Sequence, residues 1–147
     1  MGQPRQGHVD DVGVTEVWGR LRNDPNSVLI DVRTRAEWAF VGIPDLTGAN
    51  KQPVLVEFQT FPDSREDPRF GERLIASLQE MGTSTDAELF FICRSGSRSK
   101  RAAQAMIAAG YTRCRNVADG FEGPLDSMHH RGRVGGWKAA DLPWSQG

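Results

Sequence analysis

The chain has few cysteines, no long apolar run and no excess of either charge, and each absence excludes a class of protein. Only two cysteines occur in 147 residues, which is too few for a disulfide framework. No apolar stretch reaches the roughly 20 residues that a membrane-spanning helix needs. Lysine and arginine number 18 against 19 acidic residues, so the net charge of -1 predicts neither a nucleic-acid partner nor a membrane partner.

The length and the first residues favour a single cytoplasmic domain. A chain of 147 residues is the size of one domain, and no internal repeat divides it. The opening segment MGQPRQGHVDDVG lacks the hydrophobic core of a secretory signal. We therefore expect a cytoplasmic protein with free thiols, folded as one domain over residues 1–147 with residues 1–8 as a loose tail.

Short apolar runs alternate with helix-compatible segments along the chain. Strands are predicted at 28–31, 53–59, 88–93 and 114–118, with an edge strand near 9–14. Helices are predicted at 14–23, 34–42, 69–82, 97–110 and 137–140, the first capped by Thr15 and the second by Thr34. This alternation predicts an α/β structure with a mainly parallel sheet, in which ligands lie beyond the carboxyl ends of the strands.

The segment CRSGSRS places a thiol where a strand gives way to a helix. Cys93 ends a predicted strand, and the next helix is expected to start within 97–99. Gly96 permits backbone angles closed to other residues, so the loop can turn successive N–H groups inward as an anion nest. The helix N-terminus adds its partial positive charge at the same point. We therefore expect a reactive thiolate there, in a loop that suits a persulfide or a bound oxyanion.

Other polar residues are better explained by structure than by chemistry. A cysteine at a strand end often serves only to fill space in the core. The loop after Cys93 makes that residue an exception. Cys114 is interpreted as a core residue rather than as a second thiol that would form a disulfide with Cys93. Asp31 and Arg33 follow a strand, and an ion pair between Arg33 and Glu37 is expected to order that turn. The adjacent histidines 129 and 130 lack further metal-ligand spacing, so neither a metal site nor a cofactor is predicted.

Three segments together resemble the rhodanese-type sulfurtransferases. CRSGSRS with KRAAQAMIAAGYTRCRNVADGFEG resembles the active-site segment of that family, VLIDVRTRAEWAFVGIP its first signature, and GGWKAADLPW its C-terminal segment. The resemblance spans residues 28–144. Two departures stand out: Val41-Gly42 replaces a Gly-His pair, and Asp119-Gly120 replaces paired glycines. A Gly-His-Arg-rich insertion at 124–135 then precedes Trp137, and we expect these last changes to reshape a wall of the site.

The resemblance implies a three-layer rhodanese-like fold, with about five mainly parallel strands flanked by helices. It implies that Cys93 takes sulfane sulfur from a small anionic donor such as thiosulfate and passes it, through a persulfide, to cyanide or a thiol. Asp31, Arg33 and Glu37 are expected to support the site. The residues expected to bind the substrate are the loop residues Arg94, Ser95, Gly96, Ser97, Arg98 and Ser99.

Three alternatives stay open. The protein could be a relay that passes sulfur to an unidentified acceptor protein, or a non-catalytic docking module, although the intact Cys93 argues against the latter. Cysteine-based phosphatases and arsenate reductases are a further alternative. The phosphatase signature needs arginine at the sixth position after the cysteine, where it holds phosphate bidentately. Here Ser99 takes that position and Arg98 lies one residue short, which disfavours phosphate chemistry.

Overall fold

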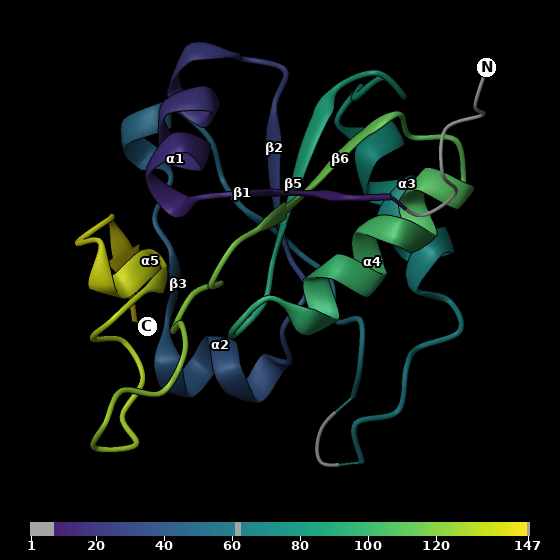
Figure 1. Cartoon of the computed structure of the whole chain (residues 1–147). Helices are drawn as coiled ribbons and strands as arrows, with labels where there is room; N and C mark the ends of the chain where they lie inside the picture. Colours follow the sequence, from purple (N-terminus) through teal and green to yellow (C-terminus); the bar gives the residue numbers. More distant parts are fainter. Residues whose placement is uncertain (1–7, 61–62, 147) are drawn as a thin grey trace, which may run out of the picture.

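The computed structural model of the chain describes residues 8–60 and 63–146. Its centre is a five-stranded sheet in the order β1-β6-β5-β2-β4, and every neighbouring pair of strands runs parallel (Figure 1). The predicted α/β fold with a mainly parallel sheet is therefore confirmed. The strands of this sheet are β1 (Asp10–Val12), β2 (Val28–Asp31), β4 (Val54–Leu55), β5 (Glu88–Ile92) and β6 (Arg113–Val117).

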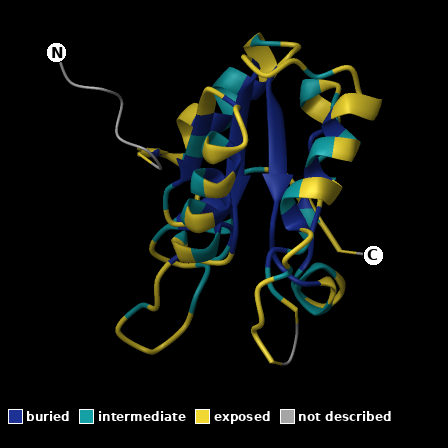
Figure 2. Cartoon of the chain, turned by 90° about the vertical axis from the view of Figure 1, so that its right-hand side faces the viewer, coloured by how far each residue is buried: buried dark blue, intermediate teal, exposed yellow. Residues whose placement is uncertain are grey.

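Helices cover both faces of the sheet. On one face, α3 (Phe70–Glu80) and α4 (Ser97–Ala108) pack their apolar residues against β5 and β2. On the other face, α1 (Val14–Asn23) and the short α5 (Gly136–Ala139) form a second apolar cluster with the same strands. Figure 2 shows the buried sheet between two helical layers whose outer surfaces are exposed. In the described part of the chain, no helix has the length and apolar character to cross a membrane.

The predicted elements differ from the observed ones in several places, and the short 3-10 helix η1 (Thr47–Ala49) was not predicted. The strand predicted at 53–59 is assigned only over Val54–Leu55, although the N–H of Val56 still donates to the Asp31 carbonyl at 3.1 Å. Helix α1 has Gly13 as its N-cap, so Thr15 lies inside the first turn and the predicted cap is wrong. An antiparallel pair of β3 (Ile43–Pro44) and β7 (Trp144–Ser145) was not predicted. The predicted loose tail, 1–8, lies outside the described residues except for its last residue.

The sheet brings two polar strand ends together. In the register of β2 and β5, Asp31 lies beside Ile92, and the N–H of Val32 donates to the Ile92 carbonyl at 3.0 Å. The residues that follow each strand therefore leave the sheet at the same edge, the lower one in Figure 1. Helix α2 (Arg35–Val41) follows β2 at this edge, and α4 begins there after β5. The residues predicted to form the site, which follow β2 and β5, therefore lie together beyond the carboxyl ends of these strands.

Candidate active site

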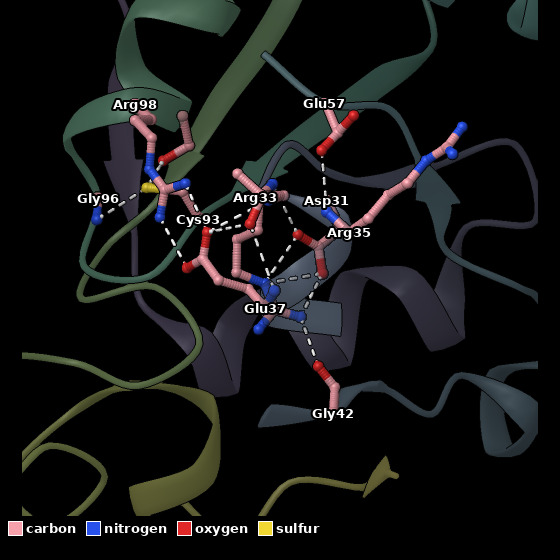
Figure 3. A network of polar contacts seen from close by, with 11 residues as sticks. Asp31, Arg33, Arg35, Glu37, Gly42, Glu57, Cys93, Gly96 and Arg98 are labelled. Carbon is pink, nitrogen blue, oxygen red and sulfur yellow. Dashed lines mark hydrogen bonds and ion pairs between the residues drawn. The ribbon is translucent and has the colours of Figure 1, made fainter. Parts of the chain in front are cut away.

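Cys93 lies at the carboxyl end of β5, beneath the loop that leads into α4. Gly96 is the N-cap of α4 and has a φ of 115°, a left-handed conformation that favours glycine. This turn brings the Gly96 N–H to 3.2 Å from Cys93 Sγ (Figure 3). Ser99, in the first turn of α4, places its Oγ at 3.2 Å from the same sulfur. The residue Cys93 is 1% exposed. The sulfur is therefore held by a backbone donor, a hydroxyl and the positive end of α4.

A hydrogen-bonded chain continues behind Ser99. Its Oγ also lies 2.5 Å from Asn116 Oδ1, and Asn116 Nδ2 donates to Asp11 Oδ1 at 2.9 Å. A hydroxyl has one proton, so Ser99 donates either to Asn116 or to the sulfur, and the proton on the sulfur decides which. Sequence reasoning missed Asn116. The alternation of side chains along a strand puts it on the same face as Cys114, next to α4, and that periodicity could have identified it.

Five of the six predicted substrate-binding residues divide into two groups, and Arg98 stands apart. Gly96 and Ser99 contact the sulfur. The side chains of Arg94, Ser95 and Ser97 are exposed around it. Arg98 belongs to neither group, because it forms a two-pronged ion pair with Glu37 of α2, at 2.7 and 2.9 Å. The pair ties the first turn of α4 to α2, and its side chains are 15% and 20% exposed.

The Glu37 carboxylate is held in its charged form by this arrangement. Burial opposes its ionisation, but the hydrogen bonds and charge of Arg98 outweigh burial and lower the pKa of Glu37 below its ordinary value of 4.5. For Arg98, burial likewise opposes the charge, whereas Glu37, Cys93 and Asp31 raise its pKa. Glu37 also completes a capping box with Thr34, whose hydroxyl accepts from the Glu37 N–H. The predicted cap of α2 is therefore confirmed.

The Glu37–Arg98 pair predicts a pH-dependent contribution to stability. A carboxylate whose pKa falls on folding stabilises the protein above its unfolded pKa, and this contribution is lost as pH falls through the lower folded pKa. We expect Glu37→Gln to lower the free energy of unfolding by about 1–2 kcal/mol near neutral pH. The difference from the original chain should shrink in urea titrations below about pH 4. Glu72→Gln is the control, because its pair with Arg69 is 74% and 72% exposed, and it should change little.

Asp31 and Arg33 form a second, fully buried ion pair beneath the site. Both side chains are 0% exposed, and Arg33 donates to Asp31 through Nε at 2.9 Å and Nη2 at 2.7 Å. Nη2 also donates to the Gly42 carbonyl at 2.7 Å, and the guanidinium stacks 4.2 Å from the Phe121 ring. The predicted pairing of Arg33 with Glu37 is therefore wrong. Arg33 pairs with Asp31, two residues before it at the end of β2, whereas Glu37 pairs with Arg98 of α4.

Gly120 joins the loop to the segment that follows β6. It has a φ of 67°, and a Cβ atom built on it would lie 2.5 Å from the Cys93 carbonyl oxygen and 2.6 Å from that of Arg94. These carbonyls accept hydrogen bonds from the N–H groups of Phe121, at 2.8 Å, and Glu122, at 3.0 Å. The Asp119-Gly120 pair thus keeps the glycine that the close backbone approach requires, while Asp119 adopts a φ of 66° that aspartate tolerates.

An open pocket of about 750 Å³ lies over the loop. Arg94, Ser97 and Arg98 line it from the loop and α4, and α2 adds Glu37 and Phe40. Further lining comes from Gln59, Thr60 and Ser64 and, on the insertion side, from Glu122 and Arg131. Of the insertion at 124–135, Arg131 lines this pocket; whether the insertion reshapes a wall of the site stays a prediction.

Cys114 and Trp137 both belong to the core. Trp137 is fully buried, donates through Nε1 to the Pro143 carbonyl at 2.6 Å, and meets Trp18 edge to face. Cys114 is 1% exposed and packs in the apolar cluster under α4. Burial raises the pKa of the Cys114 thiol to about 12, so it remains a protonated thiol at neutral pH. The interpretation of Cys114 as packing agrees with this environment.

We expect Cys114 to be inert toward thiol reagents in the folded protein. In a Cys93→Ser variant, a disulfide reagent such as dithionitrobenzoate should find no rapidly reacting thiol until denaturant is added, after which one thiol should react. The measurement is the release of the coloured product with time, with and without denaturant. Rapid release from the folded variant, or an intramolecular disulfide in the original chain after mild oxidation, would contradict the packing role.

The comparisons with known proteins place the chain among rhodanese-like proteins. The chain is 26% identical over 125 residues to Rhodanese-like domain-containing protein 4, chloroplastic, of Arabidopsis thaliana, covering 85% of this chain and 23% of that protein. It also superposes on the polysulfide-sulfur transferase of Wolinella succinogenes with a TM-score of 0.58, covering 97% of this chain and 82% of that one. Sequence identity to the latter is 17%, so this likeness is one of fold.

A family model and nearer relatives narrow the assignment. The model described as the STR4 middle domain matches residues 10–147. The crystal structure of Rv0390 from M. tuberculosis is 41% identical, with a TM-score of 0.82 over 95% of this chain and 99% of that one. The uncharacterized protein RP600 of Rickettsia prowazekii is 35% identical over 136 residues, 92% of this chain and 97% of that protein. The chain therefore belongs to the STR4 middle-domain family of rhodanese-like proteins.

Proposed function

We propose that the protein is a sulfurtransferase that moves sulfane sulfur from an anionic donor such as thiosulfate to a thiol or cyanide. The observation that carries the proposal is the position of Cys93 Sγ, 3.2 Å from both the Gly96 N–H and the Ser99 hydroxyl at the N-terminus of α4. These donors stabilise a thiolate without a neighbouring histidine base. The same donors favour an anionic persulfide sulfur, by the preorganised electrostatics of an oxyanion hole.

The reaction has two displacement steps. The Cys93 thiolate attacks the sulfane sulfur of thiosulfate, the S–S bond of the donor breaks, and sulfite leaves with the electron pair. Cys93 then carries a persulfide. Cyanide or an acceptor thiolate attacks the outer sulfur, the S–S bond of the persulfide breaks, and the Cys93 thiolate returns. Each step exchanges one bond to sulfur for another, so no cofactor or external oxidant enters the cycle.

The arrangement of Arg98 favours sulfur transfer over phosphate chemistry. Phosphatase loops use a free arginine to hold phosphate with two hydrogen bonds. In this chain both terminal nitrogens of Arg98 are directed at Glu37, and the position after it is Ser99. The proposed chemistry also needs Cys93 in its reduced form, which suits a reducing compartment such as the cytoplasm. Neither a nucleic acid nor a membrane has a part in the proposed cycle.

Intact mass spectrometry tests the proposal. After incubation with thiosulfate, the protein should gain the mass of one sulfur atom, and cyanide should remove it and yield thiocyanate. Cys93→Ser should gain no sulfur, whereas Cys114→Ser should behave like the original chain. If no sulfane donor adds sulfur while the protein is folded and reduced, the proposal is refuted. Hydrolysis of an aryl phosphate that depends on Cys93 would favour a phosphatase.

A further inference from the structure

The pocket over the loop collects positive charge in a protein that is nearly neutral overall. Four arginines line it against two glutamates, Glu37 and Glu122. Two of the arginines are neutralised, because Arg98 pairs with Glu37 at 2.7 Å and Arg101 pairs with Glu66 at 2.5 Å. Within 8–60 and 63–146, the other two, Arg94 and Arg131, have no carboxylate oxygen within 4.0 Å. The pocket therefore offers a ligand two unneutralised guanidinium groups against one remaining carboxylate, that of Glu122.

Arg131 is held in the pocket wall by the structure of the insertion. Its Nη1 donates to the Gly123 carbonyl at 2.8 Å, which leaves the remaining donors of the guanidinium for a ligand. The insertion itself is fixed by Asp126, which accepts from the N–H groups of Met128 and His130 at 2.8 and 2.9 Å. The side chain is thus anchored at the edge of the pocket by the part of the chain that departs most from the rhodanese pattern.

The shape of the site indicates what kind of molecule reaches the sulfur. A pocket of about 750 Å³ is in the range that holds small organic ligands and far exceeds the volume of thiosulfate or cyanide. Cys93 itself is 1% exposed beneath the loop. Cys93 does not line the pocket, but its neighbour Arg94 and the nearby Ser97 and Arg98 do. Because so little of Cys93 is exposed, a slender, flexible chain that lies in the pocket suits the approach to its sulfur better than a folded surface. Phe40, 79% exposed, and Val41 give the pocket an apolar side for such a chain.

We propose that the pocket binds an acceptor thiol that carries a carboxylate on a flexible chain, and that Arg131 is the residue that selects it. The carboxylate is bound by Arg131 and Arg94, while the thiol end reaches Cys93. The acceptor thiol gives its proton to solvent, and its sulfur attacks the outer sulfur of the Cys93 persulfide. The persulfide S–S bond breaks, Cys93 leaves as a thiolate, and the acceptor departs as a persulfide. This assignment rests on the proposed sulfurtransferase activity.

The test compares two thiols of equal length that differ in terminal charge, 6-mercaptohexanoate and 6-mercaptohexanol. The protein is first loaded with sulfur from thiosulfate, and loading is checked by intact mass. For each protein, the preference is the ratio of kcat/KM for the carboxylate thiol to kcat/KM for the alcohol thiol. This ratio should be about tenfold higher in the original chain than in Arg131→Gln, because the variant loses one charged hydrogen bond to the carboxylate. The difference should lie mainly in KM. Arg133→Gln is the matched control: it lies in the same insertion, is 62% exposed and pairs weakly with Asp126 at 3.9 Å, so its preference should equal that of the original chain.

The outcomes separate this assignment from the activity on which it rests. If loading is normal but Arg131→Gln keeps the charge preference of the original chain, the acceptor assignment is wrong and the sulfurtransferase proposal stands. Equal losses with both thiols would mean that Arg131 only supports the wall of the pocket, which also overturns its role in selection. If no persulfide forms with any sulfane donor, both proposals fail together.

Discussion

Replacing Arg33 with methionine should lower the free energy of unfolding by about 3–5 kcal/mol, because it leaves the Asp31 carboxylate buried without a counter-charge. Both side chains are fully buried, and Asp31 would lose the donors at 2.9 and 2.7 Å that now satisfy it. The Gly42 carbonyl, which anchors the end of α2, would lose its donor as well. Urea denaturation at neutral pH measures the loss directly.

Two controls separate the charge effect from the loss of a long side chain. Adding Asp31→Asn to Arg33→Met removes the unpaired charge, so the double variant should recover a large part of the stability lost by the single one. Arg69→Met replaces an arginine that is 72% exposed and should change stability by less than about 0.5 kcal/mol. A single variant as stable as the original chain would show that the buried pair is unnecessary for the fold.

The second large effect is expected at Gly120, where alanine should both destabilise the protein and disable the thiol loop. A left-handed φ of 67° adds about 1 kcal/mol for alanine, and the Cβ would lie 2.5 Å from the Cys93 carbonyl oxygen. Because that atom belongs to the backbone, the loop itself must shift. We expect about 2–4 kcal/mol of lost stability and at least a tenfold slower formation of the persulfide, since a small misplacement of reacting groups slows a reaction strongly.

Gly82→Ala is the matched control for this prediction. Gly82 has a φ of 75°, close to that of Gly120, but a Cβ there would meet no atom within 4 Å. It should therefore carry the backbone penalty alone, about 1 kcal/mol, and leave the rate of sulfur uptake unchanged. Chemical denaturation and stopped-flow measurement of persulfide formation give the two quantities. Similar rates of sulfur uptake in Gly120→Ala and Gly82→Ala would contradict the close approach as the cause.

The parts of the fold that could be predicted from the sequence are those governed by local periodicity. Continuous apolar runs predict the buried strands, and the helix at α4 begins at Ser97, within the predicted range. The β3–β7 pair could not be predicted in this way, because its partners lie about a hundred residues apart and each is two residues long. The cap of α1 differs for another reason. Threonine favours the N-cap position, which predicts Thr15, but Gly13, which has no side-chain acceptor, takes that position.

The candidate site shows the same division between local and long-range information. The thiol, its glycine turn and the serine at the sixth position after it lie within seven residues, so local reasoning finds them. The partner of Arg98 depends on how α2 docks against α4, which no short segment encodes. Arg33 has its partner only two residues away, at the end of β2, but Glu37 is also near in the sequence, and no local pattern distinguishes the two carboxylates. Asn116 and Arg131 join the site from a neighbouring strand and from the insertion. Only the two-residue alternation along β6 pointed toward one of them.

The thiol cradle and the pocket wall around it come from separate stretches of chain, and this bears on how such a protein diverges. The cradle is built from β5, α4 and the start of the segment after β6, which the buried sheet holds in place. The insertion is held mainly by hydrogen bonds to its own backbone and to Glu122 and Gly123. On the proposed function, changes in the insertion should alter which molecules the pocket accepts, while Cys93 keeps its geometry.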